Sequence, residues 1–195
     1  MAELNPERAL RAVGELLAYE GEEAGIVVIG GSALILLGIV ERATTDVDVV
    51  AIRRNDGAAT GIGPPDPLPE PLQKAIERVA EDFGLPAHWL NTMAGLQWRT
   101  GLPPGLEGRL EWHEFGGLRV GLASRYDLIF FKLYAAADDV GPGSVHYQDL
   151  IALEPTREEL RAAASWIGSQ DASPAFRGIV DEVVRRVRMD LGIDA

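Results

Sequence analysis

Apolar residues recur along the chain with two periods, and each period predicts a different kind of element. Between residues 10 and 17, leucine and valine recur at helical spacing, which predicts a helix over 6–19 with one buried stripe. Residues 25–29 form a continuous, largely β-branched run that is typical of a strand covered on both faces. Over 46–52 polar and apolar residues alternate, so we expect a second strand there.

The remaining segments extend this pattern into an α/β half followed by an all-helical tail. Further helices are expected over 33–38, 72–83, 125–138, 145–153, 157–167 and 174–191, and a β-hairpin over 110–115 and 118–122. Typical helix-starting residues precede several of these helices, namely Ser32, Ser124, Ser144, Thr156 and Ser173. Proline and glycine crowd into 55–71, which predicts a loop. The expected organisation is a core over 1–153 and a helical tail over 154–195 packed on the same domain.

Composition excludes several classes of protein. With 47% apolar and 25% charged residues, the chain has the balance of a globular protein. It has no cysteine, which excludes disulfides, thiolate nucleophiles and cysteine-ligated metal sites and favours a cytoplasmic location. The net charge of −12 disfavours stable coating of nucleic acid, although a transient nucleic-acid substrate stays open. No apolar run approaches the ~20 residues of a membrane span, and we expect neither a membrane segment nor a signal peptide.

The most specific chemical pattern lies where the first predicted strand ends and the second begins. Gly30 and Gly31 allow backbone N–H groups to approach a phosphate closely, and a helix starting at Ser32 adds its positive end. Asp46 and Asp48 are two apart on a strand, so both point to one face and can hold magnesium. Two such ions ~3.5–4 Å apart support an in-line displacement at phosphorus. The alternative is a tight turn beside two acidic residues that face water.

These residues, taken together, resemble a known signature. Residues 30–34, with Gly38, Arg42, Thr44 and 46–49, look like the signature of the DNA polymerase β-like nucleotidyltransferase superfamily. Within it, they resemble the small bacterial branch of abortive-infection and type IV toxin nucleotidyltransferases and their stand-alone relatives. The resemblance implies a mixed sheet that carries the metal carboxylates, flanked by helices, and a C-terminal helical region.

Later segments extend the resemblance over roughly residues 26–166. Residues 126–133 and 146–150 resemble the later motifs of the family, in which a lysine and an aspartate complete the site. Residues 89–91, Trp-Leu-Asn, resemble a recurring element of the stand-alone relatives.

Lys132 and Asp149 are the candidates for those two positions. The chain has only two lysines, and Lys132 lies in a strongly apolar stretch where burial without a partner is costly. The resemblance implies that Lys132 meets nucleotide phosphate or assists proton transfer, and that Asp149 orients it or completes the metal shell. The alternatives are a lysine whose charged end reaches solvent and an ordinary surface carboxylate.

Two further positions are candidates for the site. Arg42 precedes the second strand, where it can bind triphosphate as a fork or pair with Asp46. The superfamily places a third carboxylate on a later strand, and the local candidates are Glu111 and Glu114. Strand alternation puts these two on opposite faces, so at most one fits, and we take Glu111 as the expected metal ligand.

The expected function is a magnesium-dependent nucleotidyltransferase that moves a nucleoside monophosphate from a nucleoside triphosphate to an acceptor hydroxyl. For the toxin branch that the chain resembles, the acceptor is an RNA 3′ end or a protein side chain, and an antitoxin partner restrains the enzyme. A second interpretation is transfer to a small molecule such as an antibiotic. The third, from a different class, is a nucleotide-binding or interaction module with weak catalysis.

Overall fold

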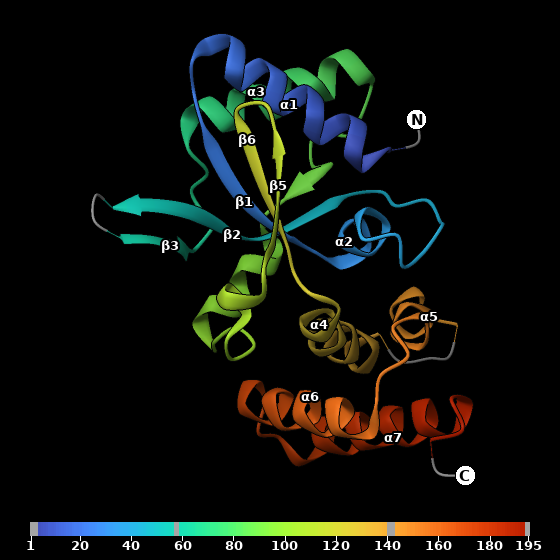
Figure 1. Ribbon diagram of the computed structural model, residues 1–195. Coiled ribbons are helices and arrows are strands. Elements are labelled where there is room, and N and C mark those ends of the chain that lie inside the picture. Colours follow the sequence, from blue (N-terminus) through green and yellow to red (C-terminus); the bar gives the residue numbers. More distant parts are fainter. Residues whose placement is uncertain (1–3, 57–58, 140–142, 194–195) are drawn as a thin grey trace. The chain divides into compact units, whose positions relative to one another are not determined.

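The computed structural model describes residues 4–56, 59–139 and 143–193 (Figure 1). The chain divides into two compact units. The first comprises residues 1–99 and 105–123, and the second comprises residues 100–104 and 124–195.

Helices and strands alternate in the first unit. Its helices are α1 (Pro6–Glu20), α2 (Gly30–Leu36) and α3 (Glu70–Phe83), with 3₁₀ helices η1 (Met93–Arg99) and η2 (Leu106–Arg109). Its strands are β1 (Ala24–Ile29), β2 (Val47–Asp56), β3 (Ala59–Gly63), β4 (Leu90–Asn91), β5 (Glu111–Phe115) and β6 (Leu118–Leu122).

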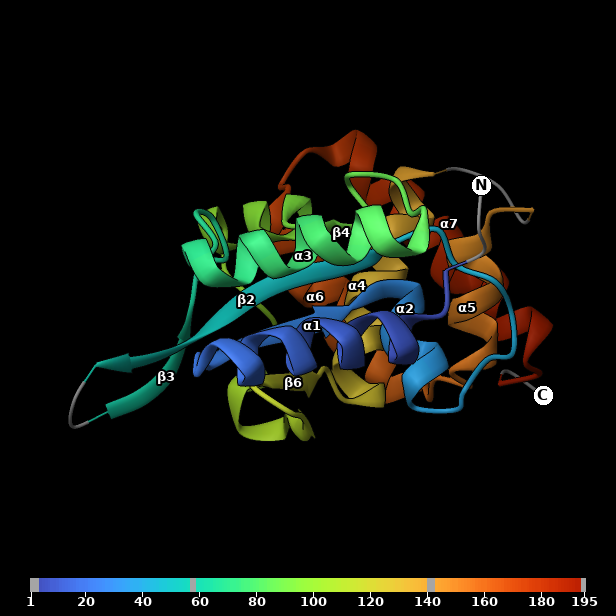
Figure 2. The same ribbon diagram turned by 90° about the horizontal axis from the view of Figure 1, so that it is seen from above.

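Over the described residues, six strands form one mixed sheet in the order β3-β2-β1-β6-β5, with β4 paired to β2. β1 runs antiparallel to β2 and parallel to β6, and β5 and β6 form an antiparallel hairpin. α1 and α3 lie side by side over one face of this sheet (Figures 1 and 2). The expected fold, a mixed sheet flanked by helices, is confirmed.

The hydrophobic periods of the sequence account for this arrangement. α1 buries one stripe against the sheet, and its Leu10 and Leu17 are 0% exposed. The Asn5 side chain caps this helix by accepting a hydrogen bond from the backbone N–H of Arg8 at 2.9 Å. β1 is buried on both faces, since neighbouring Val27 and Val28 are both 0% exposed. The first helix, the first strand and the hairpin therefore form as expected.

The expected loop over 55–71 is wrong in part. β2 runs on to Asp56, and residues 59–63 form β3, which pairs antiparallel with it; residues 57–58 lie outside the described residues. The prolines begin only at Pro64, so they leave the ladder intact. A Cβ on Gly63 would collide with the side chain of Arg54, so the absence of a side chain at this glycine leaves space for the arginine.

The start of α2 also differs from the prediction. The helix begins at Gly30 and not at Ser32, and no side chain caps it. The hydroxyl of Ser32 instead donates a hydrogen bond to the backbone carbonyl of Asp46 at 2.5 Å. The Ser32 hydroxyl, which the local sequence predicts as a helix cap, therefore bonds instead to a residue fourteen positions further along the chain.

The second unit is helical. Its helices are α4 (Arg125–Asp138), α5 (Val145–Ala152), α6 (Arg157–Gln170) and α7 (Pro174–Asp190). All four helices are capped as expected: a backbone N–H in the first turn of each helix donates to a hydroxyl oxygen of the preceding cap residue, namely Ser124, Ser144, Thr156 and Ser173. Part of the break expected at 141–144 lies outside the described residues.

α4 and α5 belong to the same compact unit as α6 and α7. The predicted division after residue 153 stays a prediction. None of the helices in the described ranges combines the length and the hydropathy that a membrane span needs.

Candidate functional site

The end of β1 and the start of β2 bring Gly30 and Asp48 together. Asp48 pairs with Ile29 across the sheet, directly before Gly30. Gly30 has a φ of +73°, a region that favours glycine, and a Cβ there would collide with Oδ2 of Asp48. Glycine at this position therefore serves both the turn into α2 and the close approach of a carboxylate.

Asp46 lies immediately before β2, and two hydroxyl groups hold its backbone. The Oγ of Ser32 and the Oγ1 of Thr44 donate to its carbonyl at 2.5 Å and 3.3 Å. Ser32 is fully buried, whereas Asp46 and Asp48 are half-buried. These bonds fix the main chain that carries Asp46 against the first turn of α2.

Asn91 is a residue of this site that was not among the candidate site residues predicted from the sequence. It lies on β4 directly beside Asp48, and its Nδ2 donates to Oδ1 of that aspartate at 3.1 Å. Trp89 anchors the segment, because it is fully buried and its indole N–H donates to the carbonyl of Ile76. The Trp-Leu-Asn resemblance was the signal for this contact: the tryptophan fixes the backbone and the asparagine orients Asp48.

Arg42 lies beside the second glycine of the pair. A Cβ on Gly31 would lie 2.7 Å from Nη2 of Arg42, so the guanidinium passes close to the first turn of α2. Its Nη1 donates to the carbonyl of Ala43 at 2.9 Å. Arg42 is thus a fixed cation next to Gly31, and its binding of triphosphate stays a prediction.

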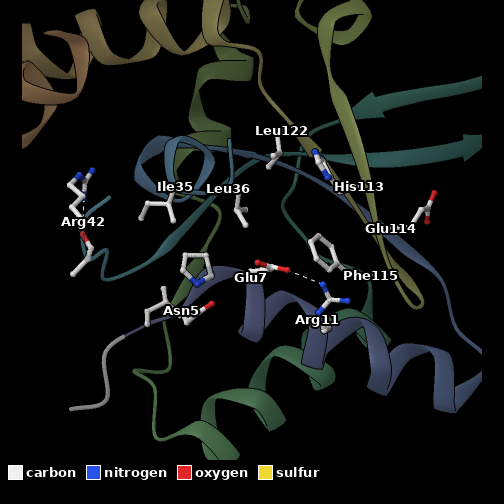
Figure 3. Close-up of a pocket in the computed structure, with 13 residues that line it drawn as sticks. Asn5, Glu7, Arg11, Ile35, Leu36, Arg42, His113, Glu114, Phe115 and Leu122 are labelled. Atoms are coloured by element: carbon white, nitrogen blue, oxygen red, sulfur yellow. Dashed lines mark hydrogen bonds and ion pairs between the residues drawn. The ribbon is translucent and has the colours of Figure 1, made fainter. Parts of the chain in front are cut away.

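Arg42 also lines a cavity of about 750 Å³ (Figure 3). The cavity wall comes from the start of α1, the end of α2 and the β5–β6 hairpin. In the close-up Arg42 lies at one end and Glu114 at the other, with the Glu7–Arg11 ion pair of 2.9 Å between them. The volume falls within the ~300–1,000 Å³ of typical small-molecule sites.

Glu111 is not brought to the two aspartates. It pairs with Leu122 on β6, whereas the next residue, Trp112, pairs with Gly121. Gly121 pairs with Val27 of β1, and Val27 shares its face with Ile29, the partner of Asp48. Strand alternation therefore puts Glu111 on the opposite face from Asp48, three strands away. The expectation that Glu111 completes a three-carboxylate shell is not met.

The donor set fits magnesium only when substrate supplies further ligands. Among the described residues, no group of three or more histidine, aspartate or glutamate side chains lies together as a metal cage would need. Mg²⁺ in nucleotide enzymes is commonly bound by one or two carboxylates, with phosphate oxygens and waters completing the octahedron. Asp46 and Asp48 match that donor set, and Gly30 leaves the space beside Asp48 clear of a side chain.

Lys132 and Asp149 form an ion pair within the helical unit. Their Nζ and Oδ2 are 2.7 Å apart, and the two side chains are 4% and 2% exposed. Lys132 lies on α4 and Asp149 on α5, so the pair joins two helices. The two residues are thus in contact, and the Lys132 side chain is buried and does not reach solvent; the orienting role of Asp149 stays a prediction. Their roles in catalysis stay predictions.

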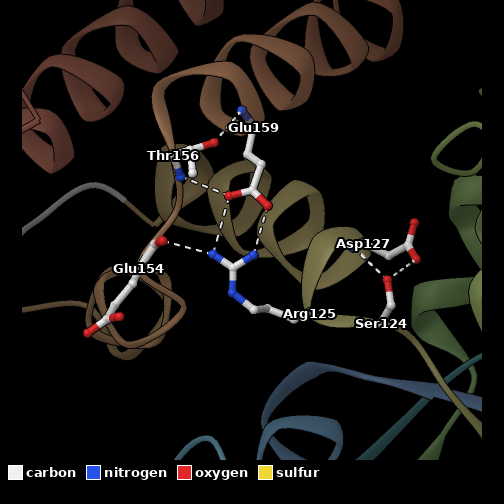
Figure 4. A network of polar contacts seen from close by, with 6 residues as sticks. All are labelled: Ser124, Arg125, Asp127, Glu154, Thr156 and Glu159. Carbon is white, nitrogen blue, oxygen red and sulfur yellow. Dashed lines mark hydrogen bonds and ion pairs between the residues drawn. The ribbon is translucent and has the colours of Figure 1, made fainter.

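A second polar network holds α4 to α6 in the same unit (Figure 4). Arg125 donates to both carboxylate oxygens of Glu159 at 2.8 Å and 3.2 Å, and to the carbonyl of Glu154 at 2.8 Å. The Arg125 guanidinium lowers the pKa of Glu159, and the Thr156 N–H adds to this against the opposing effect of burial. Ser124 donates to fully buried Asp127 at 2.6 Å at the start of α4.

Comparison with known proteins identifies the family. The family model described as "Nucleotidyltransferase of unknown function (DUF6036)" matches residues 8–141. Searches of curated proteins and of solved structures found no match. The matched range contains Gly30, both aspartates, Asn91 and Lys132. The chain therefore belongs to this family of nucleotidyltransferases.

Proposed function

We propose that the protein is a magnesium-dependent enzyme that transfers a nucleoside monophosphate from a nucleoside triphosphate to an acceptor hydroxyl. The observation that carries the proposal is the packing of the Asp48 carboxylate against the backbone of Gly30, at the turn into α2. At this turn a phosphate group is able to approach the backbone of Gly30, beside which a cation bound to the Asp48 carboxylate would also lie. Family membership supports nucleotidyl transfer in general, and this geometry supports the metal-dependent form.

Each residue of the site has a distinct task in this proposal. Asp46 and Asp48 hold the cation, and Asn91 keeps the Asp48 carboxylate in one orientation through its 3.1 Å hydrogen bond. Gly30 and Gly31 carry no side chain, so the Asp48 carboxylate and the Arg42 guanidinium lie against the first turn of α2, and the glycine backbone is able to approach phosphate oxygens closely. Arg42, next to Gly31, neutralises charge on the triphosphate through its planar fork of donors.

The reaction is an in-line displacement at the α-phosphorus. The acceptor hydroxyl oxygen forms a bond to that phosphorus while the bond to the bridging oxygen breaks, and pyrophosphate leaves. The hydroxyl proton passes to solvent. Bound magnesium supplies Lewis-acid stabilisation of charge on the phosphate oxygens and lowers the pKa of the acceptor hydroxyl. The protein contributes position and fixed charge, which are the main sources of catalysis in phosphoryl-type transfers.

The proposed acceptor is an RNA 3′ end or a protein side chain, on the resemblance to the toxin branch. On the same ground we propose that an antitoxin restrains the enzyme. The surface charge supports a transient encounter with RNA and not stable coating, because a chain of net charge −12 repels the phosphate backbone. A small-molecule acceptor is the alternative outcome of the assay below.

The test is label transfer from each α-labelled nucleoside triphosphate, with magnesium, to total RNA, to protein or to small-molecule extract. We expect label in one acceptor fraction, its loss with EDTA, and a decrease of at least about 10²-fold in Asp48→Asn. Asp82→Asn is the matched control, since Asp82 is an exposed carboxylate that pairs with Arg78 on α3. Transfer that persists unchanged in both Asp46→Asn and Asp48→Asn would contradict the proposal.

A further inference from the structure

A second pocket lies on the sheet face that carries Asp48. On that face the two central strands have glycines, Gly25 on β1 and Gly121 on β6. A Cβ at Gly25 would lie 2.5 Å from the Cβ of Arg53, and one at Gly121 would lie 3.1 Å from the ring of Trp112. Side chains of β2 and β5, the strands on either side of β1 and β6, therefore lie across the glycines of β1 and β6.

The indole of Trp112 lies flat on the sheet. Three consecutive atoms of its six-membered ring are 3.1 to 3.2 Å from the Cβ position of Gly121, so a ring face and not an edge is turned to the backbone. The side chain is nevertheless 40% exposed. The backbone thus fixes one face of the indole while the ring remains accessible, which is the arrangement of a stacking surface.

Charged groups surround this aromatic surface. The Cζ of Arg53 lies 5.9 Å from the centroid of the Trp112 ring. Arg119 is held by an ion pair of 2.8 Å with Glu114. Both arginines and Glu107 line a pocket of about 340 Å³ with Trp112, a volume at the lower end of the ~300–1,000 Å³ range of small-molecule sites. An aromatic face, two guanidinium groups and two carboxylates therefore meet in one small pocket.

We propose that this pocket binds a free purine mononucleotide at a position separate from the transfer site. The base stacks on Trp112, its exocyclic amine or ring N–H donates to the carboxylates of Glu107 or Glu114, and its phosphate meets the guanidinium groups. A single nucleotide fits better than a strand, because carboxylates line the pocket and the chain carries a net charge of −12.

Register places the pocket away from Asp48. Trp112 is level with Gly121 and Val27, two residues along β1 from Ile29, the partner of Asp48. Two residues along a strand span about 7 Å, and the three strand spacings between β2 and β5 span about 14 Å. A nucleotide stacked on Trp112 therefore occupies its own position beside the carboxylates.

Calorimetry with GMP and AMP in EDTA tests this site, because without magnesium the transfer site lacks its cation. We expect the intact chain to bind one of these nucleotides, Trp112→Leu and Arg53→Gln each to weaken binding about tenfold or more, and Trp112→Tyr to retain it. Tyr19→Ala and Arg78→Gln are controls, since Tyr19 is a 91% exposed aromatic on α1 and Arg78 is an exposed arginine on α3. Melting temperatures confirm that each variant folds.

Four outcomes would overturn the proposal: no binding by the intact chain, equal affinity in Trp112→Leu, loss of binding in Asp48→Asn, or tighter binding of a single-stranded RNA oligonucleotide than of the mononucleotide. The third would assign the nucleotide to the transfer site. The fourth would assign the surface to a strand. None of these measurements requires nucleotidyl transfer, so a failure here is distinguishable from a failure of the proposed function.

Discussion

At the scale of single residues, Gly30 and Gly21 have nearly the same positive φ in different surroundings. Their φ values are +73° and +72°, but only Gly30 faces a carboxylate, and nothing lies within 4 Å of a Cβ on Gly21. Gly21→Ala therefore pays the cost of left-handed backbone alone, about 1 kcal/mol. Gly30→Ala also places a side chain at a positive φ, and in addition it displaces the Asp48 carboxylate.

We expect Gly30→Ala to lower the rate of nucleotidyl transfer by at least about tenfold, while Gly21→Ala leaves it within a factor of about two. Transfer kinetics and urea unfolding of both variants check this. Equal effects of the two substitutions on the transfer rate would mean that the approach of Asp48 to Gly30 has no functional importance.

The burial of the Lys132–Asp149 ion pair predicts how substitutions at these residues change the free energy of unfolding. Removal of one partner leaves an uncompensated charge in a site where both side chains are at most 4% exposed. We expect Lys132→Ala to destabilise the fold by about 3–5 kcal/mol, and the double variant Lys132→Met, Asp149→Leu to lie near the stability of the intact chain. Urea unfolding measures both. If the single and double variants lose the same free energy of unfolding, an uncompensated charge on Asp149 is not what destabilises Lys132→Ala.

The same double variant separates a catalytic from a structural lysine. When urea unfolding shows that the double variant keeps the fold, a decrease in transfer of about 10²-fold or more reports the loss of a catalytic group. This is the outcome that the resemblance to the toxin branch predicts. Transfer within a few-fold of the intact chain would assign Lys132 to the packing of α4 on α5 alone.

At the scale of elements, the Arg125–Glu159 contact joins the first turns of α4 and α6 and makes stability depend on pH. Because Arg125 lowers the pKa of Glu159 below its usual 4.5, folding favours the ionised form. This contribution is fully present above the unfolded value near 4.5 and is lost as the pH falls through the lower pKa of the folded state. Stability should therefore fall on acidification in this range.

Unfolding of Glu159→Gln in urea between pH 7 and pH 3 measures that contribution. We expect the variant to be less stable than the intact chain at pH 7 and the difference to shrink toward pH 3. Glu158→Gln is the matched control, because Glu158 is an exposed glutamate in the same turn. A difference that does not change with pH would assign the role of Glu159 to packing.

Elements that depend on neighbouring residues were predictable from the sequence, and those that depend on distant ones were not. The caps at Ser124 and Thr156 are confirmed because a cap bonds a backbone group within three residues. β3 was missed because glycines and prolines crowd into its stretch of sequence, whereas its pairing with β2 and the side chain of Arg54 beside Gly63 are seen only in the fold. The contact of Asn91 with Asp48 spans 43 residues, so no local pattern contains it.

At the scale of the whole molecule, one sheet face carries two different arrangements of polar groups. At one position on the face, the Asp48 carboxylate lies beside the backbone of Gly30. At another, the ring of Trp112 lies in a pocket with Arg53 and Arg119. The spacing of Asp46 and Asp48 predicts that both carboxylates lie on one face, because strand alternation is local; β2 begins at Val47, so Asp46 directly precedes the strand and its place in the site stays a prediction. The site at Trp112 was not, because its residues come from four strands and a 3₁₀ helix.

The family match runs from residue 8 to residue 141, so it includes the sheet and α4 but ends before α5. Asp149 lies beyond the matched range, yet it pairs with Lys132 within that range. The confirmed ion pair therefore links a residue of the family region to the C-terminal helices. We expect substitutions at Asp149 to act through Lys132.

Asp46 and Asp48 are proposed to form a magnesium-dependent nucleotide site at the turn into α2. The test is calorimetric titration of a nucleoside triphosphate, with and without magnesium, into three proteins: the intact chain, the double variant Asp46→Asn/Asp48→Asn, and the control variant Asp82→Asn. We predict magnesium-dependent binding in the micromolar range for the intact chain and the Asp82 control, and at least tenfold weaker binding for the double variant. If all three proteins bind with equal, magnesium-dependent affinity and have unchanged melting temperatures, Asp46 and Asp48 do not form this site.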